Sequence, residues 1–312
     1  MKNVMITGAG GFVGRHLCEL LLNTTDWQLT LLDNMFTDDW LAENQRVTKI
    51  AGQLQDTSIL DQVFSTVFDV IFHLASLPGG AAEQDPDLSK EVNLDATLDL
   101  FERAAAQGNC PRIVFTSTIA VLGAPMPAIV DDNCLILPAM TYGAHKAMTE
   151  LALADASRRG TLDAVTVRLP GIVARPLTKN GLKSAFLSNA FHLLAAGEAF
   201  ISPVSEQATM WLMSVQQCAA NLAKGATLDS SNMPKSRVVT LPALRISMSE
   251  LLDEIVSQCG ASKQLISWKA EVELEVLFGQ QPPLLTPAAE KAGFCHDDDL
   301  STLVAKALLL TG

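Results

Sequence analysis

The stretch Thr7-Gly8-Ala9-Gly10-Gly11-Phe12-Val13-Gly14 decides the fold of this chain. It follows an apolar run, Val4-Met5-Ile6, and it opens an amphipathic segment over residues 12–23. Its glycines at positions 8, 11 and 14 permit a sharp turn, a close approach of the backbone to pyrophosphate and tight packing of the next helix. A glycine cluster alone is often only a loop. Between a strand and a helix, however, it predicts a dinucleotide-binding turn whose helix N-terminus faces the phosphates.

An acidic residue follows this turn at a suitable distance. Asp33 lies 19 residues after Gly14, at the end of the next apolar run, Gln28–Asp33. A carboxylate there can bind both hydroxyls of an adenosine ribose and repels the 2′-phosphate of NADP, so we expect NAD. The alternative is that Asp33 is a plain turn residue at the end of a strand.

Short apolar runs alternate with longer amphipathic segments through the first half of the chain. The expected strands are residues 2–7, 28–33, 46–52, 69–75, 112–116 and 163–169, and the expected helices are residues 12–23, 57–66, 90–107 and 142–158. This order predicts an α/β fold with a doubly wound parallel Rossmann sheet, and ligands at the carboxyl ends of its strands.

The rhythm changes after Pro170, where segments rich in Pro, Ser, Gly and Lys separate helical stretches at residues 184–197 and 247–258. We therefore expect residues 1–173 to form an NAD-binding Rossmann domain. Residues 174–312 should form mainly a smaller C-terminal substrate-binding subdomain, with a strand near residues 237–241 returning to the main sheet.

Composition narrows the class of protein. Hydrophobic residues make up 48% of the 312 positions and charged residues 18%, which excludes a disordered chain. A net charge of −12 disfavours nucleic acid and anionic membrane surfaces as partners, and leaves a small molecule as the expected one. The six cysteines and five histidines are dispersed without metal-ligand spacing, so we expect no metal. No apolar run suits a membrane helix, and the first strand leaves no room for a signal peptide, so a cytoplasmic location is expected.

The only tyrosine, Tyr142, lies four residues before Lys146. Positions i and i+4 share one face of a helix, and an ammonium there favours the phenolate. We therefore predict that Lys146 lowers the pKa of Tyr142 toward neutrality and that Tyr142 is a general base or acid. The alternative places Tyr142 at a helix start with Lys146 in solvent.

A third hydroxyl is expected from the end of the strand near residues 112–116. Thr118 is the preferred residue and Ser117 the second, because either can donate a hydrogen bond to a substrate oxygen as charge develops on it. The alternative is that both residues only satisfy backbone groups at a strand end.

Together these features resemble the NAD-dependent epimerase/dehydratase family of extended short-chain dehydrogenases. The resemblance spans nearly the whole chain and rests on residues 8–14, Asp33, Phe72-His73-Leu74-Ala75-Ser76, Asn93, Thr116-Ser117-Thr118 with Gly123, Tyr142-x-x-x-Lys146 and Arg168-Leu169-Pro170. Within the family, residues 115–121, 157–160 and 168–176 more narrowly resemble a dehydrogenase of a four-carbon sugar acid.

The resemblance implies roles for these residues. Tyr142 takes the proton from the substrate hydroxyl, Lys146 also binds the nicotinamide ribose, and Thr118 holds the reacting oxygen. The implied cofactor contacts are Gly8, Gly11, Phe12, Val13, Gly14, Asp33, Asn34, Gln53, Leu54, Leu74, Ala75, Ser76, Asn93, Thr116, Tyr142, Lys146, Pro170 and Ile172. The implied substrate contacts are Ser76, Thr118, Tyr142 and Thr209.

Two positions depart from the pattern. Gln53-Leu54 stands where relatives commonly have an acid that holds adenine, and its amide could supply an equivalent hydrogen bond. Thr209 stands where the narrower resemblance suggests an arginine, which leaves the anchor of a substrate carboxylate open.

The sequence is compatible with three functions. A nucleotide-sugar enzyme usually holds the substrate diphosphate with arginines, and none lies between Arg175 and Arg237. We therefore predict NAD-dependent oxidation of the C2 hydroxyl of a small sugar acid to a 2-oxo acid. The alternative is a nucleotide-sugar epimerase or dehydratase with tightly bound NAD, for which Lys179, Lys183, Lys224 and Lys235 offer positive charge. The third is a non-catalytic NAD-binding protein, against which Tyr142 and Lys146 argue. The resemblance also implies a homodimer through the helices at residues 90–107 and 142–158.

Overall fold

A seven-stranded, all-parallel sheet forms the centre of the computed structural model, which describes residues 1–36, 40–41, 43–177 and 183–311. The strand order is β10-β6-β5-β4-β1-β2-β3. The strands are β1 (Asn3–Thr7), β2 (Gln28–Asp33), β3 (Val47–Ala51), β4 (Val70–His73), β5 (Arg112–Thr118), β6 (Asp163–Leu169) and β10 (Val238–Thr240). The predicted doubly wound α/β fold is confirmed.

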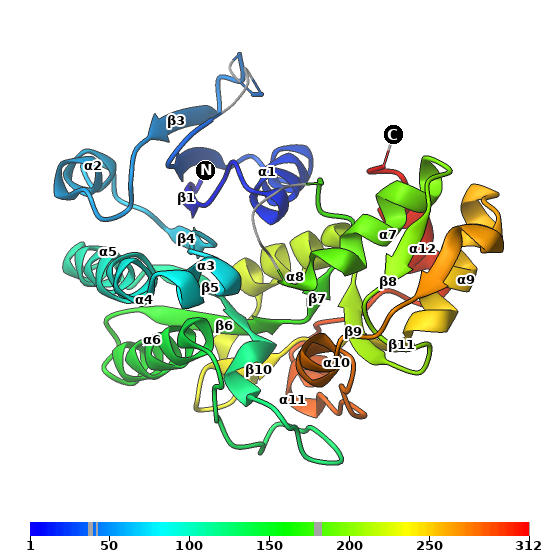
Figure 1. Cartoon of the computed structure of the whole chain (residues 1–312). Coiled ribbons are helices and arrows are strands. Elements are labelled where there is room, and N and C mark those ends of the chain that lie inside the picture. The colour runs from blue at the N-terminus through cyan, green and yellow to red at the C-terminus, as the bar shows by residue number, and fades with distance from the viewer. Residues whose placement is uncertain (37–39, 42, 178–182, 312) are drawn as a thin grey trace.

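Helices cover both faces of this sheet (Figure 1). Because successive strand residues point to opposite faces, Val4 and Ile6 pack into one hydrophobic core and Met5 into another. The first core includes α1 (Phe12–Thr24) and α8 (Val215–Thr227). The second includes α2 (Thr57–Val63), α5 (Ala96–Ala106) and α6 (Thr141–Arg158).

The second half of the chain contributes to the main sheet. β10 pairs in parallel with β6, Val238 lying opposite Thr166, at the place where the sequence predicts a returning strand. α8 packs against α1 and β5. β10 and α8 therefore belong with the main sheet and its helices, although both follow residue 173, where the sequence analysis divides the chain.

The remaining elements form a second, smaller core. β7 (Gly171–Ile172), β9 (Thr209–Met213) and β11 (Leu244–Ser247) form a three-stranded sheet, and β8 (Phe200–Ser202) pairs with β12 (Ile266–Trp268). α7 (Phe186–Ala195), α9 (Met248–Cys259) and α12 (Leu300–Leu308) pack together around buried apolar side chains. Of the short helices α10 (Val272–Phe278) and α11 (Pro287–Lys291), the first packs Phe278 against this smaller core and the second buries Ala289 in the first core of the main sheet.

The helix predicted at residues 90–107 begins earlier and is not uniform. α3 (Gly79–Gln84) is followed by α4 (Pro86–Lys90), a π-helical turn over Glu91–Asp95, and α5. Asp85 accepts a hydrogen bond from the backbone N–H of Leu88 and so caps α4.

In the described part of the chain, no helix has the length and apolar character needed to span a bilayer. Nor do the described residues contain a group of three or more His, Cys, Asp or Glu side chains that could hold a metal ion. Lys179, one of the lysines considered above, lies outside the described residues.

Candidate active site

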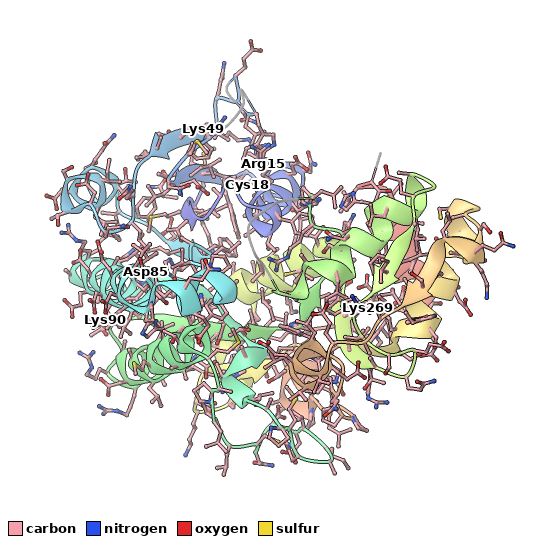
Figure 2. The ribbon with its side chains drawn as sticks, viewed as in Figure 1. Arg15, Cys18, Lys49, Asp85, Lys90 and Lys269 are labelled. Carbon is pink, nitrogen blue, oxygen red and sulfur yellow. The ribbon has the colours of Figure 1, made fainter. Side chains whose placement is uncertain are left out.

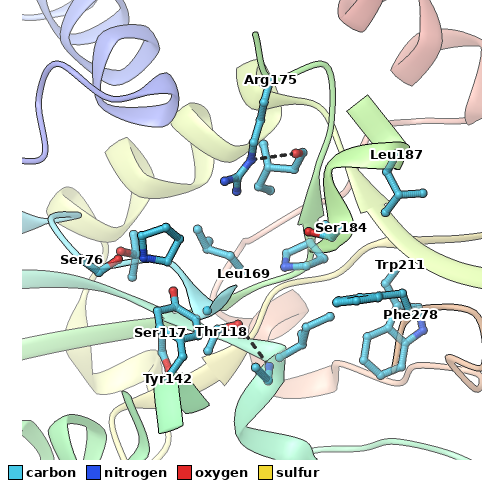
Figure 3. Close-up of a pocket in the computed structure, with 18 of the residues that line it drawn as sticks. Ser76, Ser117, Thr118, Tyr142, Leu169, Arg175, Ser184, Leu187, Trp211 and Phe278 are labelled. Atoms are coloured by element: carbon cyan, nitrogen blue, oxygen red, sulfur yellow. Dashed lines mark hydrogen bonds between the residues drawn. The ribbon is translucent and has the colours of Figure 1, made fainter. Parts of the chain in front are cut away.

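A cavity of about 450 Å³ opens at the carboxyl ends of β1, β4, β5 and β6 and extends to β9 and the end of α10 (Figure 3). This is the edge at which parallel α/β sheets bind ligands. The predicted site residues that line it are Gly8, Gly11, Phe12, Val13, Gly14, Leu74, Ser76, Thr116, Ser117, Thr118, Tyr142, Pro170 and Ile172.

The glycine turn has the shape that a dinucleotide requires. Gly8 has a φ of +69°, and a Cβ added there would lie 2.7 Å from the backbone nitrogen of Ala75. A Cβ on Gly14 would lie 2.2 Å from the carbonyl oxygen of Gly8. The turn therefore packs against β4 and α1 with no room for side chains, and it leaves the N-terminus of α1 open toward the cavity.

Asp33 lies beside this turn at the end of β2. Its Oδ2 accepts a hydrogen bond of 2.9 Å from the backbone N–H of Gly10. Arg15 of α1 and Lys49 of β3, both labelled in Figure 2, carry their charges over the ring of Trp40, with Arg15 Cζ 4.9 Å and Lys49 Nζ 5.8 Å from its centroid. The carboxylate and the glycine turn thus form one surface, which fits the ribose and pyrophosphate of NAD.

Other predicted cofactor contacts lie outside the cavity lining. Asn34 and Gln53 are exposed just after β2 and β3, whereas Leu54 is buried in a core with Ile50 and Leu60. The side chain of Leu54 therefore packs into that core and does not line the cavity.

Asn93 is buried and holds the turn that carries Ser76. Its Oδ1 accepts a 2.7 Å hydrogen bond from the N–H of Leu77, and its Nδ2 donates to the Leu77 carbonyl over 3.0 Å. Ala75 donates its N–H to Thr7 Oγ1 over 3.3 Å. In this structure Asn93 therefore positions the turn and does not itself reach the cavity.

Tyr142 and Lys146 lie on one face of α6, as the spacing predicts. Lys146 is buried, and its Nζ donates to the carbonyl of Thr116 over 2.9 Å. The same Nζ lies 5.7 Å from the centroid of the Tyr142 ring and 4.6 Å from that of Phe115. The alternative with Lys146 in solvent is therefore wrong.

The predicted effect on the tyrosine pKa is not found. Burial raises the pKa of Tyr142 above its ordinary value, and a hydrogen bond with Ser76 and the charge of Arg175 oppose this rise only in part. Burial also lowers the pKa of Lys146 to about 7, against the opposing charge of Glu150. The prediction considered the ammonium alone, but desolvation has the larger effect on both groups.

The two hydroxyls at the end of β5 have different partners. Ser117 Oγ donates a 2.5 Å hydrogen bond to Glu150, which pairs with Arg168 through two bonds of 2.9 and 2.7 Å. Thr118 Oγ1 accepts a 3.1 Å bond from the N–H of Ala120, so its own O–H stays available to a ligand. The geometry therefore favours Thr118, the first choice, over Ser117.

Several residues of the cavity were not assigned from the sequence. Arg175, Trp211, Phe278 and Gln281 line it, and among the described lining residues Arg175 alone carries a charged side chain. Arg175 lies within the quoted stretch at residues 168–176, which was the only signal for it.

Thr209 does not reach the cavity lining. Its Oγ1 donates to the backbone carbonyl of Gln281 over 2.8 Å, and Arg245 Nη2 donates to the same Oγ1 over 3.2 Å. The predicted substrate contact at Thr209 is therefore replaced here by a contact with a lining residue.

The amino-acid sequence matches a known protein family over more than half of its length. Residues 4–216 match the model of the NAD dependent epimerase/dehydratase family. The chain belongs to this family. NAD is the cofactor of this family, and the geometry of the glycine turn beside Asp33 is compatible with a dinucleotide there.

Two curated relatives in the family are named D-erythronate dehydrogenase. The one from Cupriavidus necator is 36% identical over 90% of this chain and 89% of its own. The one from Haemophilus influenzae is 33% identical over 82% of each chain. A solved structure described as a nucleoside-diphosphate-sugar epimerase from Agrobacterium tumefaciens is 30% identical, with a TM-score of 0.88 over 97% of this chain and 92% of its own.

Proposed function

We propose that this family member oxidises a hydroxyl of a small sugar acid, in the manner of a D-erythronate dehydrogenase, with Tyr142 as the general base. The observation that carries the proposal is the joint presence of Tyr142, Thr118 and, as the one cation among the described lining residues, Arg175 in one cavity beside the glycine turn (Figure 3). The names of the two curated relatives support the same class of substrate.

Thr118 O–H donates to the substrate oxygen, and Tyr142 Oη accepts the hydroxyl proton as the C2 hydroxyl becomes a ketone. When bound, NAD supplies the hydride acceptor and a positively charged ring that favours the phenolate. Lys146 donates a hydrogen bond to the Thr116 carbonyl, which helps to hold the site in place, and it adds positive charge when it is protonated. The product is a 2-oxo acid.

Arg175 suits the carboxylate of such a substrate. Its Nε donates to the Ile172 carbonyl over 3.3 Å, and Figure 3 shows the guanidinium directed toward the interior of the cavity. One guanidinium matches one carboxylate in charge and in its paired N–H donors. A nucleotide-sugar diphosphate carries more negative charge than the described lining residues balance, which favours the small acid.

A substrate panel tests the proposal. Purified protein is incubated with NAD and with C4 and C5 sugar acids, and NADH is followed by its absorbance. Net NADH with a C4 acid is the expected result. Isomerisation of a UDP-sugar without net NADH would replace the proposal with the epimerase function suggested by the name of the Agrobacterium structure, and NAD binding with neither reaction would leave a non-catalytic protein.

We also propose that the protein is a cytoplasmic homodimer. Leu88 on α4 and Met148 and Leu151 on α6 are exposed apolar side chains on helices that pack together. Leu151→Lys should shift the sedimentation coefficient to that of a monomer. An unchanged coefficient in this variant would place any dimer contact elsewhere.

A further inference from the structure

Gln281 is a wall residue of the cavity whose backbone is held at three points. Its N–H donates to the Thr209 carbonyl over 3.0 Å. Its carbonyl accepts hydrogen bonds of 2.8 Å from both Thr209 Oγ1 and Arg245 Nε. Since the residue follows α10 and is only 7% exposed, these bonds fix it against the edge of β9.

The orientation of its carboxamide is also fixed. Oε1 accepts a short hydrogen bond from the backbone N–H of Trp211. The flipped orientation would place the amide NH2 against that N–H, donor against donor, so Nε2 must point the other way.

Nε2 is therefore a donor aimed at open space. It has no hydrogen-bond partner in the part of the chain that the structure describes. It is also not enclosed by protein atoms, because the enclosed side-chain polar atoms without a partner among the described residues are Thr166 Oγ1 and Gln216 Oε1. Because Gln281 lines the cavity and is otherwise buried, the space that Nε2 reaches is the cavity.

We propose that Gln281 determines substrate specificity by donating its Nε2–H to a chain hydroxyl of the sugar acid, beyond the reacting carbon. This inference rests on the proposed function. Thr209 and Arg245 are positioning residues for it, because both bond the Gln281 carbonyl. Thr209, which stands where the narrower resemblance suggests an arginine, thereby acts on the substrate only through Gln281.

A hydroxyl is the favoured partner because of where the other groups lie. Figure 3 shows Arg175 and Trp211 entering the cavity from different sides, with Tyr142 and Thr118 on a third. A substrate whose carboxylate is held by Arg175 and whose C2 oxygen meets Tyr142 directs its remaining carbons toward the wall of Trp211 and Gln281. A neutral donor there suits a neutral oxygen, and a substrate lacking that oxygen leaves a buried N–H unpaired.

The test compares substrates that differ only in chain hydroxyls. Values of kcat/KM are measured for a 2,3,4-trihydroxybutanoate and for its 3-deoxy and 4-deoxy analogues of the same C2 configuration. The wild type should prefer the trihydroxy acid over one analogue by about tenfold or more, since one lost hydrogen bond of about 1.4 kcal/mol is tenfold. In Gln281→Met this preference should fall to about twofold or less, while the Kd for NAD stays unchanged.

Two further variants separate specificity from folding. Gln281→Glu keeps an acceptor for the Trp211 N–H but replaces the NH2 with an anionic oxygen, so kcat/KM should fall for all the anionic substrates. Gln280→Glu adds the same charge at the adjacent, exposed position, and its kcat/KM should match that of the wild type.

A wild-type preference that persists in Gln281→Met, or a Gln281→Glu that matches Gln280→Glu, overturns the role of Gln281 and leaves the proposed function standing. A wild-type enzyme that forms no NADH from any sugar acid overturns both.

Discussion

The amine of Lys146 is buried away from water, and this burial makes the free energy of unfolding depend on pH. Its pKa is about 7 in the folded protein and near 10.5 when the chain unfolds. Between these values the unfolded chain binds the extra proton, so the free energy of unfolding rises with pH through this window, by at most about 1.4 kcal/mol per unit. Below about pH 7 the full cost of burying the charge is present.

Lys146→Met isolates this effect. We expect the free energy of unfolding of the wild type, relative to the variant, to increase steadily from pH 7 to pH 9 in urea titrations. Tyr142 does not interfere, because burial keeps its pKa above the ordinary value. A difference between the two proteins that is flat with pH would mean that Lys146 stays protonated when folded.

Arg175→Gln tests the proposed carboxylate anchor. Loss of a charged hydrogen bond should raise the KM for the acid by about 10-fold to 100-fold, with little change in the Kd for NAD. Lys269→Gln removes an exposed cation outside the cavity lining and serves as the charge control (Figure 2). If Arg175→Gln weakened NAD and left the KM for the acid unchanged, the guanidinium would belong to the cofactor pyrophosphate instead.

At the residue scale, the sequence predicts what depends on local spacing. Tyr142 and Lys146 share a face because four residues make about one helical turn, whatever surrounds them. The direction of the Tyr142 pKa depends on burial by distant segments, so spacing could not supply it. The sequence could not identify Gln281 as a site residue for the same reason, because the N–H that orients its side chain belongs to Trp211, 70 residues away.

At the element scale, the closest fit in the cofactor site is between β1 and α1. Gly14→Ala would place a Cβ within 2.2 Å of the Gly8 carbonyl oxygen, so the helix must move away from the turn. We expect a loss of about 2 kcal/mol or more in the free energy of unfolding, as for other overpacked sites, together with weakened NAD binding.

Gly11→Ala is the matched control for stability. Gly11 has a φ of −73°, and its added Cβ would lie 3.2 Å from the same oxygen, which a small adjustment accommodates. Both variants are compared by thermal unfolding without cofactor. Equal losses of stability in the two would show that the spacing at Gly14 does not limit the packing of α1.

Most of the regular elements in the first half of the chain, and two helices in the second half, are predictable from the sequence. α6 and the six strands of the first half coincide closely with the expected segments, and α7 and α9 with the helices expected at residues 184–197 and 247–258. The short strands β7, β8, β11 and β12 were not expected, because two to four residues carry no readable alternation. The five-residue strand β9 and the 13-residue helix α8 were missed as well. The π-helical turn before α5 also has no sequence pattern of its own.

At the scale of the whole molecule, the cavity joins two parts that the chain order keeps apart. The glycine turn, Thr118 and Tyr142 come from the main sheet, whereas Trp211 and Gln281 come from the segments around the smaller core. The first set follows from the rule that parallel strands bind ligands at their carboxyl ends. The second depends on how β9 and the end of α10 pack against that edge, which no local pattern encodes.

The central claim is that Tyr142 abstracts the proton of a sugar-acid hydroxyl in this cavity. The most direct measurement is the steady-state rate of NADH formation from a C4 sugar acid by the wild type and by Tyr142→Phe, with the Kd for NAD measured in parallel. The account predicts a fall in kcat of about 100-fold or more at nearly unchanged Kd, because the lost group acts in proton transfer. A Tyr142→Phe enzyme with wild-type kcat would contradict it.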